Sequence, residues 1–386
     1  AGVAAGFVYL LIPPGTRPPP SPGAPGGTVR GSQRMPARLP LLFLPELIMR
    51  SPVLRSSLVF GAFCSLCAAA FAAALMFGAR AIPAETVWQA FSAFDASDAE
   101  HGIVRGLRMQ RALSGAACGA ALAAAGVIMQ GLTRNPLADP GLMGVNAGAA
   151  LAVVAVLWGL GPQSTPAVAA AAVAGAGVAA AAVWRLAGGR ETAASQALMV
   201  RLPLAGTAIS SLCLALVSAV VLLNTETRDL YRFWMAGSLG QATFNSLARL
   251  LPLICAGAVL ALAAAPGVDS LLLGSDVAAG LGTRPERAAA AGLAAVTLLS
   301  GGAVALAGPV GFVGLIIPHA TRAAGLRSTA AAVLAAMPLG AAFVLGCDTL
   351  GRIAARPSEI AIGLVLAVIG GPAFMILLSR ILGPAE

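Results

Sequence analysis

The chain has 386 residues, of which 58% are hydrophobic and only 10% are charged, and its mean hydropathy is +0.88. A soluble domain carries about 25% charged residues, so this composition excludes an ordinary soluble protein and indicates a polytopic helical membrane protein. The formal net charge of +9 comes from arginines scattered between apolar segments, which favours membrane topology signals over a nucleic-acid-binding patch.

The sequence contains no lysine. A Walker A phosphate-binding loop requires one, because the lysine side chain must reach the β- and γ-phosphates. We therefore expect no ATPase site in this chain, and a nucleotide-driven step would need a separate subunit. The six cysteines fall in or at the ends of apolar segments, and the pair Cys64 and Cys67 has no histidine nearby. We expect neither a disulfide framework nor a metal site from them.

Residues 1–50 differ in composition from the rest of the chain. A short apolar run precedes a Pro/Gly-rich segment, 13–40, which cannot bury a core, and we expect this N-terminal extension to be disordered. The apolar run has no basic region before it, so a cleaved signal peptide fits poorly. A later start at Met35 or Met49 is an alternative. The remaining residues, 51–386, form the predicted transmembrane permease domain.

Ten apolar segments follow, each near the length of about 20 residues that a bilayer requires. We place them at 55–79, 109–133, 141–160, 165–187, 202–223, 244–265, 286–306, 308–324, 329–347 and 359–380. An amphipathic stretch, 80–107, separates the first two. With the N-terminus inside, most arginines fall on the cytoplasmic side, which predicts that both termini are cytoplasmic.

The stretch from residue 108 to residue 149 is the most informative part of the sequence. Arg108 and Arg111 open an Ala/Gly-rich span whose small side chains would let neighbouring helices approach closely. The span ends in a polar break, Arg134-Asn-Pro-Leu-Ala-Asp-Pro-Gly141, in which each proline removes a backbone donor. An apolar segment resumes directly after it, so the break indicates a tight turn at one membrane face.

Three stretches resemble the FecCD-type permeases, the membrane subunits of ABC importers for iron-siderophores, haem and cobalamin. They are MQGLTRNPLADPGLMGVNAGA from Met129, GPVGFVGLIIPHATR from Gly308, and the tail around Cys347-Asp-Thr-Leu-Gly-Arg352 and Ile369-Gly-Gly-Pro372. The similarity covers residues 55–381 in the family's order. It implies an all-α polytopic fold with the architecture of a type II ABC importer permease.

The resemblance also implies a function and partners. The chain would be a permease in the bacterial inner membrane that moves haem from periplasm to cytoplasm, with an iron-siderophore or cobalamin as alternative substrates. Its partners would be a second copy of itself, two ATP-binding cassette subunits, a periplasmic substrate-binding protein and the lipid bilayer. ATP and Mg²⁺ would bind the ATPase subunits, and we expect no cofactor bound by this chain itself.

Three arginines are implied to dock the substrate-binding protein. Arg108 and Arg111 lie at the outer end of the second span and Arg352 at the outer end of the ninth. Charge attraction would steer that encounter and set its register. Snorkelling of arginine side chains at helix ends is the structural alternative.

Asn135 and Leu137 are implied to form a cytoplasmic gate, where an apolar constriction would close the pore. The alternative is capping of the next helix by Asn135 and Asp139. The second gate segment of the family corresponds to Met199 and Val200, just before the fifth span. The small hydroxyl residues of the cobalamin branch are missing there, which favours another substrate.

The segment after the sixth span, 271–282, is implied to be the coupling element that sits in a groove of the ATPase. Its candidate contact residues are Leu272, Gly274, Ser275, Asp276, Ala279 and Gly280. We expect Ser275 or Asp276 to cap its second half. An ordinary connecting loop is the alternative, although leucine and valine exposed to the cytosol would then need cover.

Few ionisable residues remain as candidates for other roles. His319 lies in a predicted broken helix without a second ligand, and His101 lies in a predicted outer loop, where we expect it to be solvated. We expect neither histidine to bind iron. Asp348 and Glu359 flank the connection between the last two spans, and we expect them to pair with the arginines nearby, among them Arg352.

Two other classes of membrane protein fit this sequence less well than an importer. A secondary transporter driven by protons or sodium keeps acidic residues at mid-membrane, and the spans here contain almost none. A membrane-embedded enzyme would need a nucleophile with its base or a set of metal ligands, and neither appears in the spans.

Overall fold

The computed structural model describes residues 52–189 and 197–382, and every regular element within these ranges is helical. They belong to one compact unit of the chain. The predicted N-terminal extension lies outside the described residues. The first elements are α2 (Pro52–Met76), α3 (Ala84–Ser92), α4 (Ala99–Gly102), the π-helix η3 (Ile103–Arg108), α5 (Met109–Thr133), the 3-10 helix η4 (Pro140–Met143), α6 (Val145–Leu160) and α7 (Thr165–Leu186). The later ones are α9 (Ala197–Leu223), α10 (Thr225–Met235), α11 (Phe244–Leu272), α12 (Ser275–Gly280), α13 (Pro285–Ala307), α14 (Val313–Ala323), α15 (Thr329–Ala354) and α16 (Ile362–Leu382).

Each of the ten predicted spans coincides with a helix, which confirms the all-α polytopic fold. Within the described ranges, seven helices are long and apolar enough to cross a bilayer by length and composition. They run over Arg55–Met76, Ala99–Thr133, Thr165–Leu186, Ala197–Leu223, Phe244–Leu272, Pro285–Ala307 and Thr329–Ala354. α6, α14 and the apolar part of α16 are shorter, and α14 begins only at Val313, as a short and broken eighth span requires.

Two helices, α11 and α15, run well past their predicted ends. α11 continues through Pro266 to Leu272 instead of ending at residue 265, because neighbouring helices support a proline-containing turn in a packed bundle. α15 continues to Ala354 instead of residue 347, so Asp348 and Arg352 lie inside the helix. In both cases the predicted end lies close to polar residues. These residues bind partners inside the protein, so the helix continues past them.

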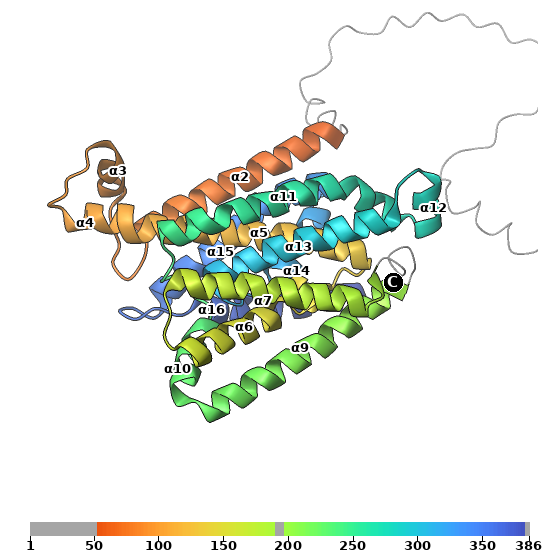
Figure 1. Ribbon diagram of the computed structural model, residues 1–386. Helices are drawn as coiled ribbons and strands as arrows, with labels where there is room; N and C mark the ends of the chain where they lie inside the picture. Colours follow the sequence, from red (N-terminus) through yellow and green to blue (C-terminus); the bar gives the residue numbers. More distant parts are fainter. Residues whose placement is uncertain (1–51, 190–196, 383–386) are drawn as a thin grey trace, which may run out of the picture. The chain divides into compact units, whose positions relative to one another are not determined.

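α5 is the central helix of the bundle (Figure 1). It packs along α15 and α13, and it also contacts α2, α11 and α14. Most of its side chains are buried, whereas α2 and α9 leave most of their apolar surface exposed. The Ala/Gly-rich α5 therefore occupies the interior, and α2 and α9 occupy the edges, where exposed phenylalanine on α2 and exposed leucine on both helices suit contact with lipid.

Pairs of glycines make the closest helix contacts. Gly119 of α5 faces Gly340 of α15, and a Cβ on either residue would overlap the backbone carbonyl of the other. Gly148 of α6 and Gly175 of α7 meet in the same way. Helices in a bilayer are held together by van der Waals packing and hydrogen bonds, so a close backbone approach stabilises the bundle directly. The expected close approach of the Ala/Gly-rich helices is confirmed.

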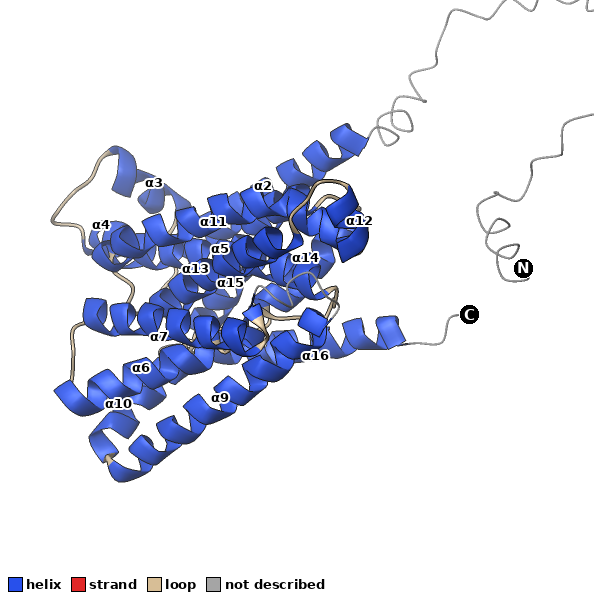
Figure 2. Cartoon of the chain, turned by 45° about the vertical axis from the view of Figure 1, so that its right-hand side comes forward, coloured by secondary structure: helices blue, strands red, loops and turns tan. Residues whose placement is uncertain are grey.

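The helix bundle has two different ends (Figure 2). At the end that we call the arginine end, α5 begins with Arg111 in its first turn, and α2 and α15 finish. At the opposite end, the α12 end, α5 and α11 finish and α12 follows. The start of α2 and the end of α16 both lie at the α12 end (Figure 2).

Candidate functional site

Arg111 is held between two carboxylates at the arginine end. Its Nε and Nη2 atoms lie 3.0 and 2.9 Å from Oδ1 of Asp348 on α15, and its Nη1 lies 2.5 Å from Glu359. Arg352, one turn further along α15, places its Nε 3.1 Å from the carboxylate of Asp348. The Asp348 side chain is only 3% exposed, so one buried carboxylate lies between two guanidinium groups. The hydrogen bonds from Arg111 to these carboxylates are charge-assisted, and such bonds are about twice as strong as neutral ones.

Two arginines from outside α2 bind carbonyls in its last turn, and a third arginine binds the loop that follows. The last carbonyls of a helix lack partners within it and carry partial negative charge, so guanidinium groups stabilise them. Arg108 donates to the carbonyls of Leu75 (2.6 Å) and Arg80, Arg352 to that of Ala74 (3.1 Å), and Arg356 to that of Gly78 (3.0 Å). These bonds turn Arg108 and Arg352 inward, and both residues are buried.

These contacts bear on the sequence interpretations of this region. The expected pairing of Asp348 with Arg352 is confirmed. Glu359 pairs with Arg111 on α5 instead of with an arginine of its own segment. Arg108, Arg111 and Arg352, the residues implied to dock a partner, all bond within the chain in this conformation. Their docking role stays a prediction.

The expectation that His101 is a solvated loop residue is wrong. His101 is buried in α4, where its Nδ1 accepts a hydrogen bond from the Asp95 backbone N–H (3.1 Å) and its ring stacks on Phe94. Arg105 lies over the same Phe94 ring at 4.6 Å. The stretch predicted as amphipathic folds into a small helical hairpin with contacts of its own, which encloses the histidine. The described ranges hold no group of three or more His, Cys, Asp or Glu side chains suited to a metal ion.

The polar break after α5 is a loop with its own internal hydrogen bonds. Arg134 takes a left-handed conformation (φ 48°) and ends α5. The Asn135 carboxamide accepts from the backbone N–H of Leu137 at 2.9 Å, so Asn135 stabilises the turn itself instead of capping a helix. Asp139 accepts from the Gly141 N–H at 2.7 Å and caps η4, as expected. Burial raises the pKa of Asp139 above its usual range.

Met199 and Val200, expected in a segment before the fifth span, lie instead in the first turn of α9. Val200 is exposed and Met199 is half-buried. η4 packs against α9, and Gly206 permits the contact, because a Cβ there would overlap the carbonyl of Leu142. The polar break and the start of α9 therefore lie near each other at the α12 end. The gating role of these residues stays a prediction.

The predicted coupling element is a short exposed helix, α12. Gly274 precedes it with a φ of 113°, a conformation that residues with a side chain rarely adopt. The expected cap by Ser275 or Asp276 is wrong, because Gly274 is the N-cap and no side chain bonds to the free N–H groups. Ala279 and Gly280 lie in the exposed second half of α12. The exposed apolar side chains around the helix are Leu272, Leu273, Val277 and Leu281. Such a clustered apolar surface is typical of a contact site.

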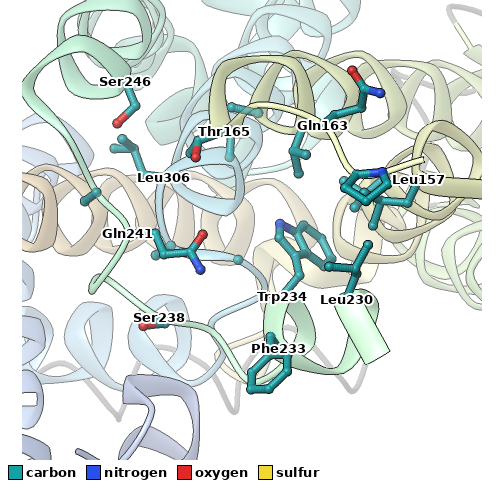
Figure 3. Close-up of a pocket in the computed structure, with 18 residues that line it drawn as sticks. Leu157, Gln163, Thr165, Leu230, Phe233, Trp234, Ser238, Gln241, Ser246 and Leu306 are labelled. Atoms are coloured by element: carbon teal, nitrogen blue, oxygen red, sulfur yellow. The ribbon is translucent and has the colours of Figure 1, made fainter. Parts of the chain in front are cut away.

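A cavity of about 240 Å³ lies between α6, α7, α10, α11 and α13, toward the arginine end. Figure 3 shows the Trp234 indole and the Gln241 carboxamide facing it, with Gln163 and Thr165 on the opposite wall. None of the residues that line it is ionisable. A cavity of about 150 Å³ accepts benzene, so this one has room for an uncharged ring, whereas an ion would lose its hydration without compensation.

Sequence interpretation missed two polar residues that join helices. Gln130, inside the Ala/Gly-rich span, donates to two backbone carbonyls of α14 at 3.2 and 3.3 Å and accepts from Arg322 at 2.5 Å. Asp269, in the last turn of α11, accepts from the backbone and hydroxyl of Thr329. A polar side chain within an apolar span is itself a signal of such contacts, and Gln130 carries that signal.

The comparisons with known proteins agree on one family. The FecCD transport family matches residues 66–380. The chain is 41% identical to the ferric enterobactin transport system permease protein of Escherichia coli over 317 residues, which cover 81% of this chain and 92% of that protein. It is 34% identical to the hemin transport system permease protein of Yersinia pestis over 310 residues, which cover 78% and 90% of the two chains.

A solved structure has the same fold. It is described as an inward-facing conformation of a metal-chelate type ABC transporter, and it matches with a TM-score of 0.73 at 25% sequence identity. The match covers 84% of this chain and 99% of that one. The likeness therefore extends over nearly the whole of the solved chain.

Proposed function

Since this chain belongs to the FecCD transport family, we propose that it is the transmembrane permease subunit of an ABC importer that moves an iron chelate from the periplasm to the cytoplasm. Membership makes it an ABC transporter permease, a transport subunit whose ATPase lies on a separate chain. The observation that carries the proposal is the match over residues 66–380, which includes nine of the ten predicted spans in full and part of the first.

A ferric siderophore is the first candidate substrate and haem is the second, which reverses the order that the resemblance alone implied. The relative from Yersinia pestis is named for hemin, and the relative from Escherichia coli is named for ferric enterobactin. The higher identity to the latter, 41% against 34%, favours a siderophore. The apolar pair Met199 and Val200 replaces the hydroxyl residues of the cobalamin branch, which disfavours cobalamin.

The proposed assembly contains two copies of this chain, two ATPase subunits and a periplasmic substrate-binding protein. One copy would supply half a pore, and closed two-fold symmetry is the commonest way to complete such a surface. The assembly would lie in the bacterial inner membrane with both termini of the permease in the cytoplasm. The start of α2 and the end of α16 lie at the α12 end, which supports this orientation, because α12 is the proposed contact with the cytoplasmic ATPase.

We propose that α12 docks on the ATPase and that Asn135, Leu137, Met199 and Val200 form the cytoplasmic gate. The exposed Leu273, Val277 and Leu281 give α12 the apolar surface that a helix-in-groove contact needs. The break and the start of α9 lie at that same end, so movement of α12 acts close to the proposed gate.

Docking at the arginine end would proceed by exchange of partners. Arg111 is already bound to Glu359, whose side chain is 41% exposed, so a carboxylate of the binding protein would have to replace Glu359. Charge reversal of Arg111 should then weaken docking and reduce its dependence on salt. Arg80 is the matched control, because its side chain is 77% exposed. An effect of Arg80→Glu that exceeds that of Arg111→Glu would assign docking to the exposed arginine instead.

Reconstitution into liposomes tests the proposed function. The chain is combined with its ATPase and binding protein, and uptake of haem and of a ferric siderophore is measured with and without ATP. ATP-dependent uptake of either compound is the expected result, and the compound taken up identifies the substrate. Uptake driven by an ion gradient through this chain alone would overturn the importer proposal.

A further inference from the structure

The last turn of α11 is tied to three other segments of the chain. It is bonded to the first residue of α15, to the loop that follows α12, and to the residue that ends α5. The bonds join Asp269 to the Thr329 N–H (3.0 Å) and hydroxyl (2.5 Å), the Ser270 hydroxyl to that of Thr283 (3.1 Å), and the Leu271 carbonyl to the Arg134 guanidinium. Three consecutive residues thus hold three different elements.

Two of these contacts gain strength from helix electrostatics. The Arg134 guanidinium lies at the C-terminal end of α11, where the helix carries partial negative charge. The Asp269 carboxylate lies at the N-terminal end of α15, where the backbone N–H groups carry partial positive charge. Each charged side chain therefore meets the helix end of opposite sign, which makes both contacts stronger than neutral hydrogen bonds.

α12 is attached to this turn on both sides. Only Leu272, Leu273 and Gly274 separate Leu271 from α12, and the Leu271 carbonyl also accepts from the Gly274 N–H at 3.0 Å. After α12 the backbone N–H of Thr283 donates to the Ala278 carbonyl at 3.0 Å. A displacement of α12 therefore pulls on the last turn of α11 from both of its connections.

We propose that residues 269–271, with Arg134 and Thr329, form a junction that transmits movement of α12 to two places. Through Arg134 the movement reaches the end of α5 and the polar break. Through Asp269 it reaches α15, a continuous helix that carries Asp348 and Arg352 at the arginine end. Arg134 and Asp269 are positioning residues in this proposal, which rests on the proposed coupling role of α12.

The first experiment measures coupling in the reconstituted complex with its ATPase and binding protein. Arg134→Met and Asp269→Ala should keep basal ATP hydrolysis within about twofold of the unmodified complex and lower substrate uptake per ATP at least tenfold. The double variant should fall no further than the worse single variant, because residues that act through one junction are not additive. Uptake per ATP that equals that of the unmodified complex in both single variants would overturn the proposal.

Arg327→Met is the matched control. Arg327 is exposed, lies two residues before Thr329, and has no ion pair within the described part of the chain. It should leave uptake per ATP unchanged. A loss equal to that of Arg134→Met would mean that removal of positive charge at this end, and not the junction, lowers coupling, and the proposal would fail.

The second experiment uses the chain alone in lipid nanodiscs, so its result does not depend on transport. Hydrogen exchange should rise at least threefold at the first amides of α15 in Arg134→Met, because a frayed α11 end releases Asp269. Within the described residues, Arg134 has no hydrogen bond or ion pair to α15 of its own. Exchange that changes only within residues 134–144 would overturn the junction. If the unmodified complex fails to transport, the proposed function fails, and this exchange measurement still decides whether the junction exists.

Discussion

Replacement of Asp348 by Asn should destabilise the chain strongly. The Asp348 carboxylate lies 2.9 Å from Arg111 and 3.1 Å from Arg352 and is almost completely buried. Asn has nearly the same shape but no charge, so both guanidinium groups lose their buried counter-charge. Removal of one partner from a buried ion pair costs about 3–5 kcal/mol of unfolding free energy. The variant removes the counter-charge of two arginines, but Arg111 keeps Glu359. The loss of unfolding free energy should therefore stay within the range for one buried pair and not double.

Glu359→Gln is the internal control for this prediction. Glu359 binds the same arginine at 2.5 Å, but its side chain is 41% exposed. A pair with an exposed partner contributes about 0–1 kcal/mol, because water screens the attraction. Arg111 itself is only 13% exposed, but in this variant it keeps the Asp348 carboxylate. Each variant therefore removes one carboxylate from Arg111, but Asp348 is buried and also pairs with Arg352, whereas Glu359 is partly exposed and pairs with Arg111 alone.

Unfolding in mixed micelles measures the difference. The chain is titrated with a denaturing detergent, and loss of helix is followed by far-UV circular dichroism. A difference of about 3 kcal/mol corresponds to more than a hundredfold in the unfolding equilibrium constant. Equal shifts for the two variants, or a shift below about 1 kcal/mol for Asp348→Asn, would refute the argument from burial.

Three further predictions follow from the packing, the polar break and the cavity. Gly119→Leu should lower the free energy of unfolding by about 3 kcal/mol or more, because the new side chain meets the backbone of α15. Gly177→Leu is the control, because no atom lies near that position, and it should change the free energy of unfolding by less than about 1 kcal/mol. Unfolding titrations that rank the two variants equally would contradict this. The raised pKa of Asp139 means that the folded chain binds this proton more tightly than the unfolded chain, so stability should fall as pH rises from the usual aspartate pKa to the raised one. Asp139→Asn should lose that slope, and an unchanged slope would assign it to another group. In a variant whose only tryptophan is Trp234, benzamide should bind the cavity and quench the tryptophan emission saturably. Benzoate should bind at least tenfold more weakly, because the cavity lining is uncharged. Gln241→Leu should weaken benzamide binding severalfold, and equal binding of the two probes would exclude a site for neutral compounds.

The sequence alone determined the fold class and the approximate position of every span. Length and apolar composition are enough for this, because a bilayer admits only segments that satisfy their own backbone, and helices do so residue by residue. The abundance of alanine and glycine in α5 also indicated that neighbouring helices approach it closely, as Gly340 of α15 does at Gly119. The motif at the polar break indicated the family, because its residues are contiguous in the chain and can be recognised without tertiary information.

The partners of the polar residues were decided only by the tertiary structure. Arg111 finds Asp348 across 237 residues of sequence, and Asp269 finds Thr329 across 60. No local pattern encodes such a pairing, because it depends on which helices become neighbours and in what register. The same reason explains why His101 is buried and why α15 runs on past its first acidic residue. A charge placed at a helix end by hydropathy alone can lie inside the protein once another helix supplies its counter-charge.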